Sequence, residues 1–533
     1  MTSIFTKITN MERHSYDIDL IKRLCKKQPK GEFNCTDVAK KYAKEKDLDF
    51  SQSVARSIQK IVNNHGLHID MVSPKNHIQF TMALKRSFVQ TKKNTIITWA
   101  QAVTPIHEGL WENLLAYAEE HDAEVIVIPG TYLNNNSPFQ WRRDYAWDNR
   151  LTNYLYATEA SVHNHLSVIA DTDIVPTAKR PLNNLQGVTG IESSIVGHPR
   201  QHMQISPTMK NRRRKFMFTT GSITVPNYRR ARAGKEASIY HKMGFLFVEN
   251  LNEENFVARH IHAEEDGSFQ DLIYRVEKGK VSLKNDWKAM IFGDTHLSKE
   301  DSGMLEESRR LVTIGKCEQT VWHDLFDGYS INHHQAKDHV EQVIKARKGL
   351  FSLQGELDMN MEFIKSWKDT NMIIVPSNHP DWIDKWVRFN QGVKDAHNAL
   401  LFNRFQSILF EELAPKGLYA HVIEENFGDE VTCLERDISH EVCGIELNNH
   451  GDLGSNGAKG TAITFAKLPH PVVSGDKHHC YTIDEAYGVG VSSVLDHKYN
   501  KGMSSWAQSN GIILSNGRFQ HLLYFDGKFT NLI

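Results

Sequence analysis

Five short apolar segments in the C-terminal half of the chain each run into acidic or histidine residues, and this series constrains the fold more than any other feature. The motifs that follow these segments are GDTH at 293–296, HDLFD at 323–327, SNHPD at 377–381, NHGD at 449–452 and GDKH at 475–478. The apolar runs predict short buried strands, and the helical patterns between them predict an α/β arrangement. Because sites in open α/β sheets form at the carboxyl ends of strands, we expect these side chains to converge at one edge of a sheet.

The order and spacing of the five motifs resemble the calcineurin-like metallophosphoesterase superfamily. The pattern of that family is DxH, GDxxD, GNH followed by an acidic residue, a single histidine, and GHxH. The long helical segment between the second and third motifs is most similar to the SbcD-type DNA nucleases. The resemblance covers residues 287–533. It implies a four-layer α+β sandwich that hydrolyses phosphoesters.

The resemblance also implies a role for each motif residue. In the family, two groups of three side chains each hold one metal ion, and one aspartate bridges the two ions. The first group would be Asp294, His296 and His478, the bridging residue Asp324, and the second group Asn378, His450 and Asp476. His379 is implied as the catalytic residue at the scissile phosphate and the leaving oxygen, with Asp381 as the acidic residue that orients its ring.

Four positions depart from the family pattern. Two of its glycines are replaced by His323 and Ser377, and Pro380 separates the catalytic histidine from its acidic partner. Asp476 stands where the family has the first histidine of the last motif, and the adjacent His479 leaves that assignment open. A carboxylate at this position favours hard cations. The implied cofactors are therefore two divalent metal ions, with Mn²⁺ as the first choice and Mg²⁺ as the alternative.

The length of 533 residues predicts more than one domain. We expect a small helical, helix-turn-helix-like module at 1–90, an α/β domain at 94–285 and the catalytic domain at 287–533. The module is predicted from a helix around Val38–Ala43 and a second one over 53–63. The middle domain shows the same strand–helix–strand rhythm as the catalytic domain but lacks its acidic and histidine positions. It is either a degenerate copy of the catalytic domain or a platform for oligomerisation or DNA binding.

Two basic clusters in the middle domain flank an apolar strand at 216–218 and are candidates for contact with phosphate backbones. The arginines concerned are Arg212, Arg213, Arg214, Arg229, Arg230 and Arg232. A solvated charged face explains the same clusters equally well. The formal net charge of the whole chain is only -1, so any attraction to a nucleic acid has to be local.

Cysteine usage and hydropathy bear on the compartment. The chain has six cysteines and no CxxC pair, which is typical of a reducing cytosol and not of a disulfide scaffold. No apolar run approaches the roughly 20 residues that span a bilayer. We therefore expect a cytoplasmic protein without a membrane partner. Related nucleases often dimerise, so a homo-oligomer is expected as well.

Taken together, the motifs predict a two-metal-dependent enzyme that hydrolyses phosphodiester bonds, with DNA as the substrate. The size and arrangement are also similar to those of phage-encoded proteins that degrade host DNA, which would place the enzyme in the cytoplasm of an infected bacterium. Two alternatives remain open at this stage. One is a metallophosphoesterase that acts on a different phosphoester, and the other is a DNA-binding or inhibitory protein whose phosphoesterase site has decayed.

Overall fold

The computed structural model describes residues 17–27, 35–47, 54, 55, 58, 61, 62, 80, 81, 88, 90–132, 146–389 and 391–533. The chain divides into two compact units, Met1–Gln79 and Phe80–Ile533. None of the described helices combines the length and the apolar character that crossing a lipid bilayer requires.

The first unit contains two described helices, α1 (Ile18–Lys26) and α2 (Cys35–Glu45). Apolar side chains of both helices form a small core, in which Ile21 and Val38 are fully buried. The helix predicted around residues 38–43 is thus present as α2, whereas α1 was not predicted. The predicted helix over 53–63 lies largely outside the described residues, so the helix-turn-helix-like reading of this unit stays a prediction.

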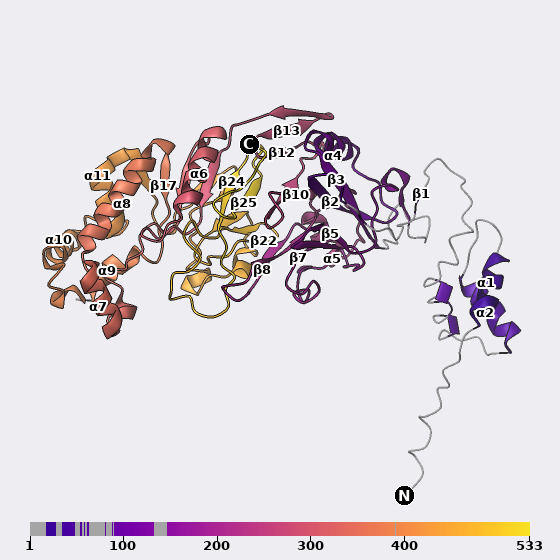
Figure 1. Ribbon diagram of the computed structural model, residues 1–533, viewed down its shortest axis with the longest axis horizontal. Helices are drawn as coiled ribbons and strands as arrows, with labels where there is room; N and C mark the ends of the chain where they lie inside the picture. The colour runs from indigo at the N-terminus through magenta and orange to yellow at the C-terminus, as the bar shows by residue number, and fades with distance from the viewer. Residues whose placement is uncertain are drawn as a thin grey trace, which may run out of the picture. The chain divides into compact units, whose positions relative to one another are not determined.

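The second unit is a mixed α/β structure whose strands form three large sheets (Figure 1). A four-stranded sheet has the order β11-β10-β2-β3, with bounds Phe256–His262, Gly244–Asn250, Asn94–Gln101 and Ala123–Gly130. A six-stranded sheet has the order β18-β17-β16-β15-β24-β25, with bounds Val431–Cys433, Met372–Ile374, Thr320–Trp322, Ala289–Phe292, Ser509–Ile513 and Phe519–Leu523.

The third sheet has ten strands and runs through both halves of the second unit. Its first five strands, in order, are β19 (Glu441–Val442), β20 (Ile445–Glu446), β21 (Val472–Ser474), β23 (Ala486–Gly488) and β22 (Tyr481–Ile483). The other five are β8 (Met203–Ser206), β9 (Lys215–Thr219), β7 (Ser193–Val196), β6 (Leu166–Ile169) and β5 (Ala160–His163). The two sets meet at a single antiparallel pair, in which Met203 lies opposite Thr482.

Both halves of the ten-stranded sheet have the same connectivity. From the outer edge inward, β5, β6, β7, β9 and β8 pair antiparallel, parallel, parallel and antiparallel. The strands β19, β20, β21, β23 and β22 repeat this pattern in the same order. In the other sheets, β3, β2, β10 and β11 pair as β16, β15, β24 and β25 do. The second unit is therefore an internal duplication, with an approximate two-fold axis between Met203 and Thr482.

The duplication changes the predicted domain organisation. The boundary expected near residue 286 falls inside one compact unit, because strands from both sides of it share the ten-stranded sheet. Periodicity along the chain does not reveal this sharing, since it depends on pairing between strands that are distant in sequence. The repeated strand order is consistent with one of the two readings of 94–285, a degenerate copy of 287–533, and leaves the platform reading open.

In each repeat, a sheet packs face to face on half of the ten-stranded sheet. In the second repeat, buried side chains such as Ile291, Val321 and Val473 fill the space between the two sheets. The opposite face of the four-stranded sheet is covered by α4 (Glu108–Glu120), the predicted helix of the first repeat. These stacked layers place the ends of strands from two sheets next to each other.

The two repeats differ mainly by a helical insertion in the second. Helix α6 (Ser302–Ile314) follows β15, as predicted. The long helical segment after β16 consists of α7 (His339–Lys348) and α8 (Leu353–Trp367), which are separated at Gly349 in a left-handed conformation. The insertion continues after β17 with α9 (Asp381–Arg388), α10 (Ala399–Phe410) and α11 (Leu418–Phe427).

Candidate metal centre

The predicted ligands lie at the ends of strands from two sheets. Asp294 and Asp324 follow β15 and β16, and Asn378 follows β17, all in the six-stranded sheet. His450 follows β20, and the segment with Asp476 and His478 follows β21, both in the ten-stranded sheet. The expectation of a single sheet edge was therefore wrong, because the site forms in the seam between two packed sheets.

The first predicted ligand group is compact. Oδ2 of Asp294 lies 2.8 Å from Nε2 of His478, and the Nε2 atoms of His478 and His296 lie 3.2 Å apart. Asp294 and His296 are fully buried, and His478 is 9% exposed. One ligand atom from each of these residues falls within a sphere small enough for a single metal ion.

The second predicted group surrounds Asp324 from the other side. Oδ2 of Asp324 lies 3.7 Å from Nε2 of His296 and 3.9 Å from Nε2 of His450. Oδ1 of Asn378 lies 3.0 Å from Nε2 of His450, and Oδ1 of Asp476 lies 4.0 Å from the same nitrogen. Asp324 thus lies between the two groups, at the position expected of a bridging carboxylate. Of the two residues considered at the last motif, Asp476 contacts the group.

The chemistry of these side chains fits bound cations. Asp294 and Asp324 are buried close together, and no lysine or arginine among the described residues forms an ion pair with either carboxylate. Oδ2 of Asp294 accepts no well-aligned hydrogen bond from the described part of the chain, although a histidine nitrogen lies close to it. A buried carboxylate without a partner is costly. Divalent cations coordinated by these oxygen and nitrogen atoms would remove that cost.

Backbone conformation marks the same residues. His296, Asp324, Asp476 and His478 all have positive φ, at 47°, 46°, 59° and 58°. This left-handed region is unfavourable for residues with a Cβ, and such strain persists only where surrounding contacts enforce it. Here the amide of His296 donates to the carbonyl of Asp324 at 2.9 Å, so the two strained loops hold each other. Their shared strain is consistent with a functional constraint on these loops.

The predicted catalytic histidine faces the site. Nδ1 of His379 donates to the carbonyl oxygen of Asp327 at 2.7 Å, which leaves Nε2 directed toward Oδ2 of Asp324 at 3.8 Å. The ring stacks on Trp382 at 4.3 Å. Burial alone would lower the pKa of His379, but the carboxylate of Asp324 and the carbonyl of Asp327 raise it above its usual value.

Asp381 does not orient this histidine. Its carboxylate forms an ion pair with Arg436 at 3.1 Å, and the residue begins α9. Pro380 continues the chain into that helix, which carries the Asp381 side chain toward Arg436. The role that the resemblance assigned to Asp381 is filled by the backbone of Asp327.

Two residues that contact the predicted ligands, Asp327 and Trp506, were not predicted from the sequence. Oδ1 of Asp327 lies 3.4 Å from Nδ1 of His296, and Oδ2 of Asp327 pairs with Lys299 at 2.6 Å. A carboxylate behind a metal-ligating histidine orients the ring and raises its basicity. The second aspartate of the HDLFD motif was the available signal. The ring of Trp506 packs on His478 at 4.1 Å, and no motif predicted it.

In the described residues, the first repeat lacks the corresponding group of acidic and histidine side chains. Trp99 occupies the place of Asp294, since its amide donates to Gly221 as that of Asp294 donates to Gly490. At Gly197, after β7, an added Cβ would meet the side chains of Trp99 and Ile128, whereas at the corresponding Gly475 it would meet Asp294. All clusters of potential metal ligands found in the described residues belong to the second repeat.

The predicted basic residues lie beyond opposite ends of β9. Arg212, Arg213 and Arg214 are in the turn between β8 and β9, while Arg229, Arg230 and Arg232 are near the start of α5 (Arg232–Ile239). The turn is anchored to the rim of the metal centre. Thr208 pairs with Ser504, and Nε of Arg214 donates to the carbonyl of Trp506 at 2.8 Å.

Two arginines of this turn differ in their partners. Arg213 is neutralised by Glu254 at 3.2 Å. Arg214 bonds only neutral oxygens among the described residues, namely backbone carbonyls and the hydroxyl of Thr208. Burial lowers the pKa of Arg214. A partly buried guanidinium without a carboxylate is suited to receive an anion beside the centre.

The protonation of Asp324 leads to a prediction on metal affinity. Burial raises the pKa of Asp324 to about 7, and the nearby charge of Asp294 adds to this shift. We expect Mn²⁺ affinity to fall about tenfold per pH unit below 7, because a proton competes for this carboxylate. The same shift makes the metal-free protein lose stability as pH rises from about 4 to 7, since the folded state binds the extra proton. Calorimetric titrations at several pH values measure the first effect, and an affinity independent of pH would contradict it.

The comparison with curated proteins finds a phage relative. The chain is 27% identical over 466 residues to "Protein A1" of Escherichia phage T5, and the match covers 83% of each chain. No protein-family model matches the chain. No solved structure matches it either. The similarity to a T5 protein agrees with the phage origin expected from the motifs.

Proposed function

We propose that this protein is a metal-dependent phosphodiesterase of the calcineurin-like type that cleaves DNA. The observation that carries the proposal is the convergence of seven predicted ligands, from five separate strand ends, on one buried position. These residues are Asp294, His296, Asp324, Asn378, His450, Asp476 and His478. Two divalent cations, Mn²⁺ first and Mg²⁺ as the alternative, would supply charge neutralisation for the phosphate and lower the pKa of a water nucleophile.

The protein side chains contribute positioning and proton transfer. His379 is held by the Asp327 carbonyl with Nε2 facing the centre, and its raised pKa favours the protonated form. It donates a proton to the leaving oxygen of the cleaved bond. Asp327 keeps the ring of His296 in place from behind. Ser377 donates to Oδ1 of Asp324 at 2.8 Å and fixes the bridging carboxylate.

Two observations favour DNA over another phosphoester. The turn with Arg212 and Arg214 lies beside Trp506, which packs on His478. Exposed His333 and His334 lie near Trp382, which stacks on His379. These aromatic rings are available for base stacking. The relative in phage T5 supports a phage origin, and we place the proposed enzyme in the cytoplasm of the infected host. Cleavage of other phosphoesters is the alternative within the same chemistry.

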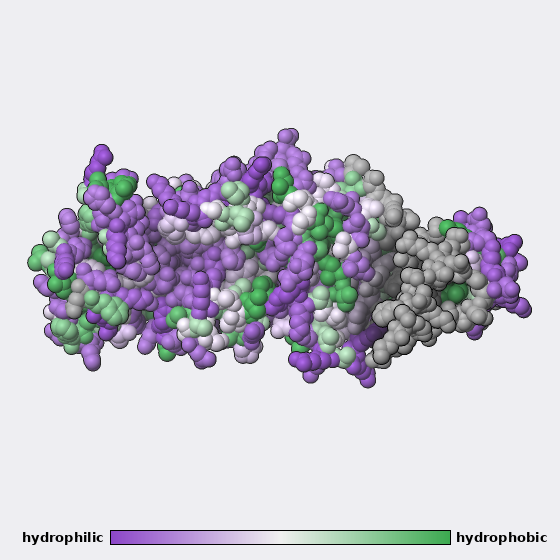
Figure 2. Space-filling model, turned by 90° about the horizontal axis from the view of Figure 1, so that it is seen from below, coloured by the Kyte–Doolittle hydropathy of each residue, from purple (hydrophilic) through white to green (hydrophobic). Residues whose placement is uncertain are grey.

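The exposed helical insertion supports the proposal of a homo-oligomer. Figure 2 shows hydrophobic surface over this part of the protein, within a largely hydrophilic face. Large apolar side chains there are strongly exposed, namely Phe389, Val393, Leu400, Phe410 and Leu413. Exposed large apolar side chains gathered in one part of a protein are typical of protein–protein contacts. Light scattering of the purified chain tests this part of the proposal.

The test of the proposed activity is cleavage of labelled duplex DNA with and without metal. We expect cleavage with Mn²⁺, none after chelation, and a decrease of about 10²–10⁴-fold in kcat for His379→Gln. Bis(p-nitrophenyl) phosphate and p-nitrophenyl phosphate, assayed in parallel, separate diester from monoester chemistry. Undiminished cleavage by His379→Gln would remove the assigned role of this histidine. The absence of any metal-dependent cleavage would favour a decayed site with a binding or inhibitory function.

Arg214 gives a separate prediction for substrate binding. We expect Arg214→Gln to weaken DNA binding by roughly tenfold, with kcat little changed. The slope of log Kd against the logarithm of the salt concentration should fall by about one. Arg213→Gln is the matched control, because Glu254 already neutralises this neighbouring residue. Equal losses in the two variants would show that the turn acts only through its total charge.

A further inference from the structure

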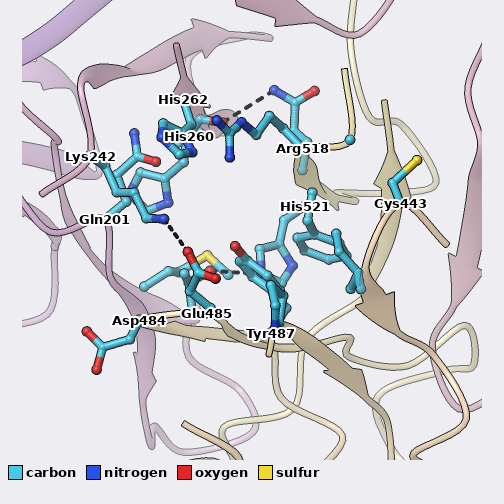
Figure 3. Close-up of a pocket in the computed structure, with 18 residues that line it drawn as sticks. Gln201, Lys242, His260, His262, Cys443, Asp484, Glu485, Tyr487, Arg518 and His521 are labelled. Carbon is cyan, nitrogen blue, oxygen red and sulfur yellow. Dashed lines mark hydrogen bonds and ion pairs between the residues drawn. The ribbon is translucent and has the colours of Figure 1, made fainter. Parts of the chain in front are cut away.

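A second polar pocket lies at the seam between the two repeats, apart from the metal centre. Its cavity has a volume of about 140 Å³ and opens to solvent at its mouth. Residues of β11 in the first repeat and of β25 in the second line it, so both repeats contribute to its wall. Figure 3 shows Lys242, His260 and His262 on one side of the space and Arg518, His521 and Tyr487 on the other.

The charges around this pocket leave one cation without a carboxylate. Lys242 pairs with Glu485 across the pocket wall (Figure 3). The carboxylate of Asp484 turns away from the space and binds Arg200 and Arg180. Nε of Arg518 is buried and has no hydrogen-bond partner within the described part of the chain. Both acidic groups of the lining are therefore engaged, while Arg518 is available to an anion.

The positive charges of Lys242 and Arg518 act on His262 inside the pocket. Burial lowers the pKa of His262 well below its usual value, and the charges of Lys242 and Arg518 lower it further. His262 is consequently neutral at pH 7 and does not compete for an anion. Arg518 therefore offers a planar guanidinium to a phosphate group, and Lys242 adds positive charge to the same pocket.

Two histidines at equivalent positions of the repeats offer a second kind of contact. His260 lies opposite Leu246 in the pair β10–β11, and His521 lies opposite Gly511 in the pair β24–β25. Burial lowers the pKa of His260 to about 4 and that of His521 to about 3, so both rings are neutral.

Contacts with backbone carbonyls, which only accept, assign the proton of each ring to Nε2; Nε2 of His521 also lies 3.0 Å from the hydroxyl of Thr482. Nε2 of His260 donates to the carbonyl of Thr219 at 2.7 Å, and Nε2 of His521 lies 3.2 Å from the carbonyl of Tyr481. Nδ1 of each ring is then an acceptor, and Nδ1 of His521 has no partner among the described residues. Acceptors of this kind suit the amino groups of a nucleobase, which inorganic phosphate lacks. Stacked Tyr487 and Phe519 add an aromatic surface to the same wall.

We propose that the pocket at the seam of the two repeats binds a phosphomonoester of nucleotide size, with Arg518 and Lys242 at the phosphate and the histidine acceptors at the base. The proposal does not depend on the metal centre, since the two sites share no residue. The region where the two repeats meet then has a binding function that is separate from the metal centre.

Isothermal titration calorimetry in EDTA tests this proposal with the catalytic centre kept free of metal. The ligands are deoxyadenosine monophosphate, deoxyadenosine and inorganic phosphate. We expect the nucleotide to bind and the nucleoside to bind at least tenfold more weakly. Arg518→Gln should weaken nucleotide binding by tenfold or more, and Lys242→Gln should do so as well. Arg404→Gln, at an exposed arginine paired with Glu425, is the control with no expected effect.

The outcomes distinguish inorganic phosphate from a nucleotide as the ligand. They also distinguish a failure of this proposal from a failure of the proposed DNA cleavage. Phosphate that displaces the nucleotide completely at equal concentration assigns the pocket to inorganic phosphate, whereas weak displacement assigns it to the nucleotide. Nucleotide binding that survives both substitutions, equal binding of the nucleoside, or no binding of any ligand at millimolar concentration would overturn the proposal. Thermal unfolding of each variant verifies that the fold is retained. Failure of DNA cleavage would leave this measurement unaffected, because no metal is present.

Discussion

Asp324→Asn is expected to abolish DNA cleavage, with a loss of at least about 10³-fold in kcat, while the protein stays folded. The Asp324 carboxylate lies between the two predicted ligand groups, near both His296 and His450. The substitution keeps the acceptor for Ser377 but removes the negative charge that would hold two cations together. A second metal ion should therefore be lost, and metal content measured by mass spectrometry should fall from two to one or none.

The stability of the same variant provides an internal control. The raised pKa of Asp324 indicates that its charged form is disfavoured in the metal-free fold. We therefore expect Asp324→Asn to have an equal or higher Tm than the parent protein in EDTA at pH 8. In Mn²⁺ the order should reverse, because only the parent gains stability from bound metal. Retained cleavage, or a Tm that falls equally with and without metal, would contradict the bridging role.

Arg259→Ala is expected to destabilise the protein by about 3–5 kcal/mol. The guanidinium is fully buried and forms ion pairs with Glu249 at 3.0 Å and Asp271 at 2.9 Å, both of which are fully buried as well. Removing the cation leaves two buried carboxylates without their partner. Glu249 also accepts from the amide of Asn531, so the C-terminal segment should loosen together with the sheet.

Chemical denaturation followed by tryptophan fluorescence measures this effect. Arg404→Ala is the matched control, because its ion pair with Glu425 is exposed and should contribute at most about 1 kcal/mol. A similar small loss in both variants would show that the buried cluster is neutral to stability. Arg259 is not one of the predicted metal ligands. We therefore expect folded Arg259→Ala to bind metal with the same affinity as the parent protein.

The clustered acidic and histidine residues could be predicted from local sequence, whereas their partners could not. Asp294, Asp324 and Asn378 each follow a short apolar run, and such runs predict a strand without knowledge of its neighbours. That Asp327 supports His379 through its carbonyl depends on how two loops meet, and the sequence offered Asp381 instead. The rim residue Trp506 lies in a loop without a motif, and only the fold places it on His478.

The domain boundary failed for a related reason. The strand–helix rhythm offered a degenerate copy as one reading of the first half, and the paired strand orders are consistent with it. The rhythm cannot show that β8 pairs with β22 and so joins both repeats in one sheet. The pocket with Arg518 exists only because of that junction, since its walls come from segments about 260 residues apart in the chain, such as His260 and Gln520.

The amino-acid sequence by itself determined which side chains bear the chemistry, since each strand and the polar residues after it are specified by neighbouring residues. The tertiary structure decided that these strand ends belong to two sheets, that the first repeat fills the equivalent position with Trp99 and Ile128, and that the repeats share a polar seam. Pairing between distant strands and the packing of their faces depend on the whole chain at once. Local sequence patterns therefore do not predict this pairing and packing.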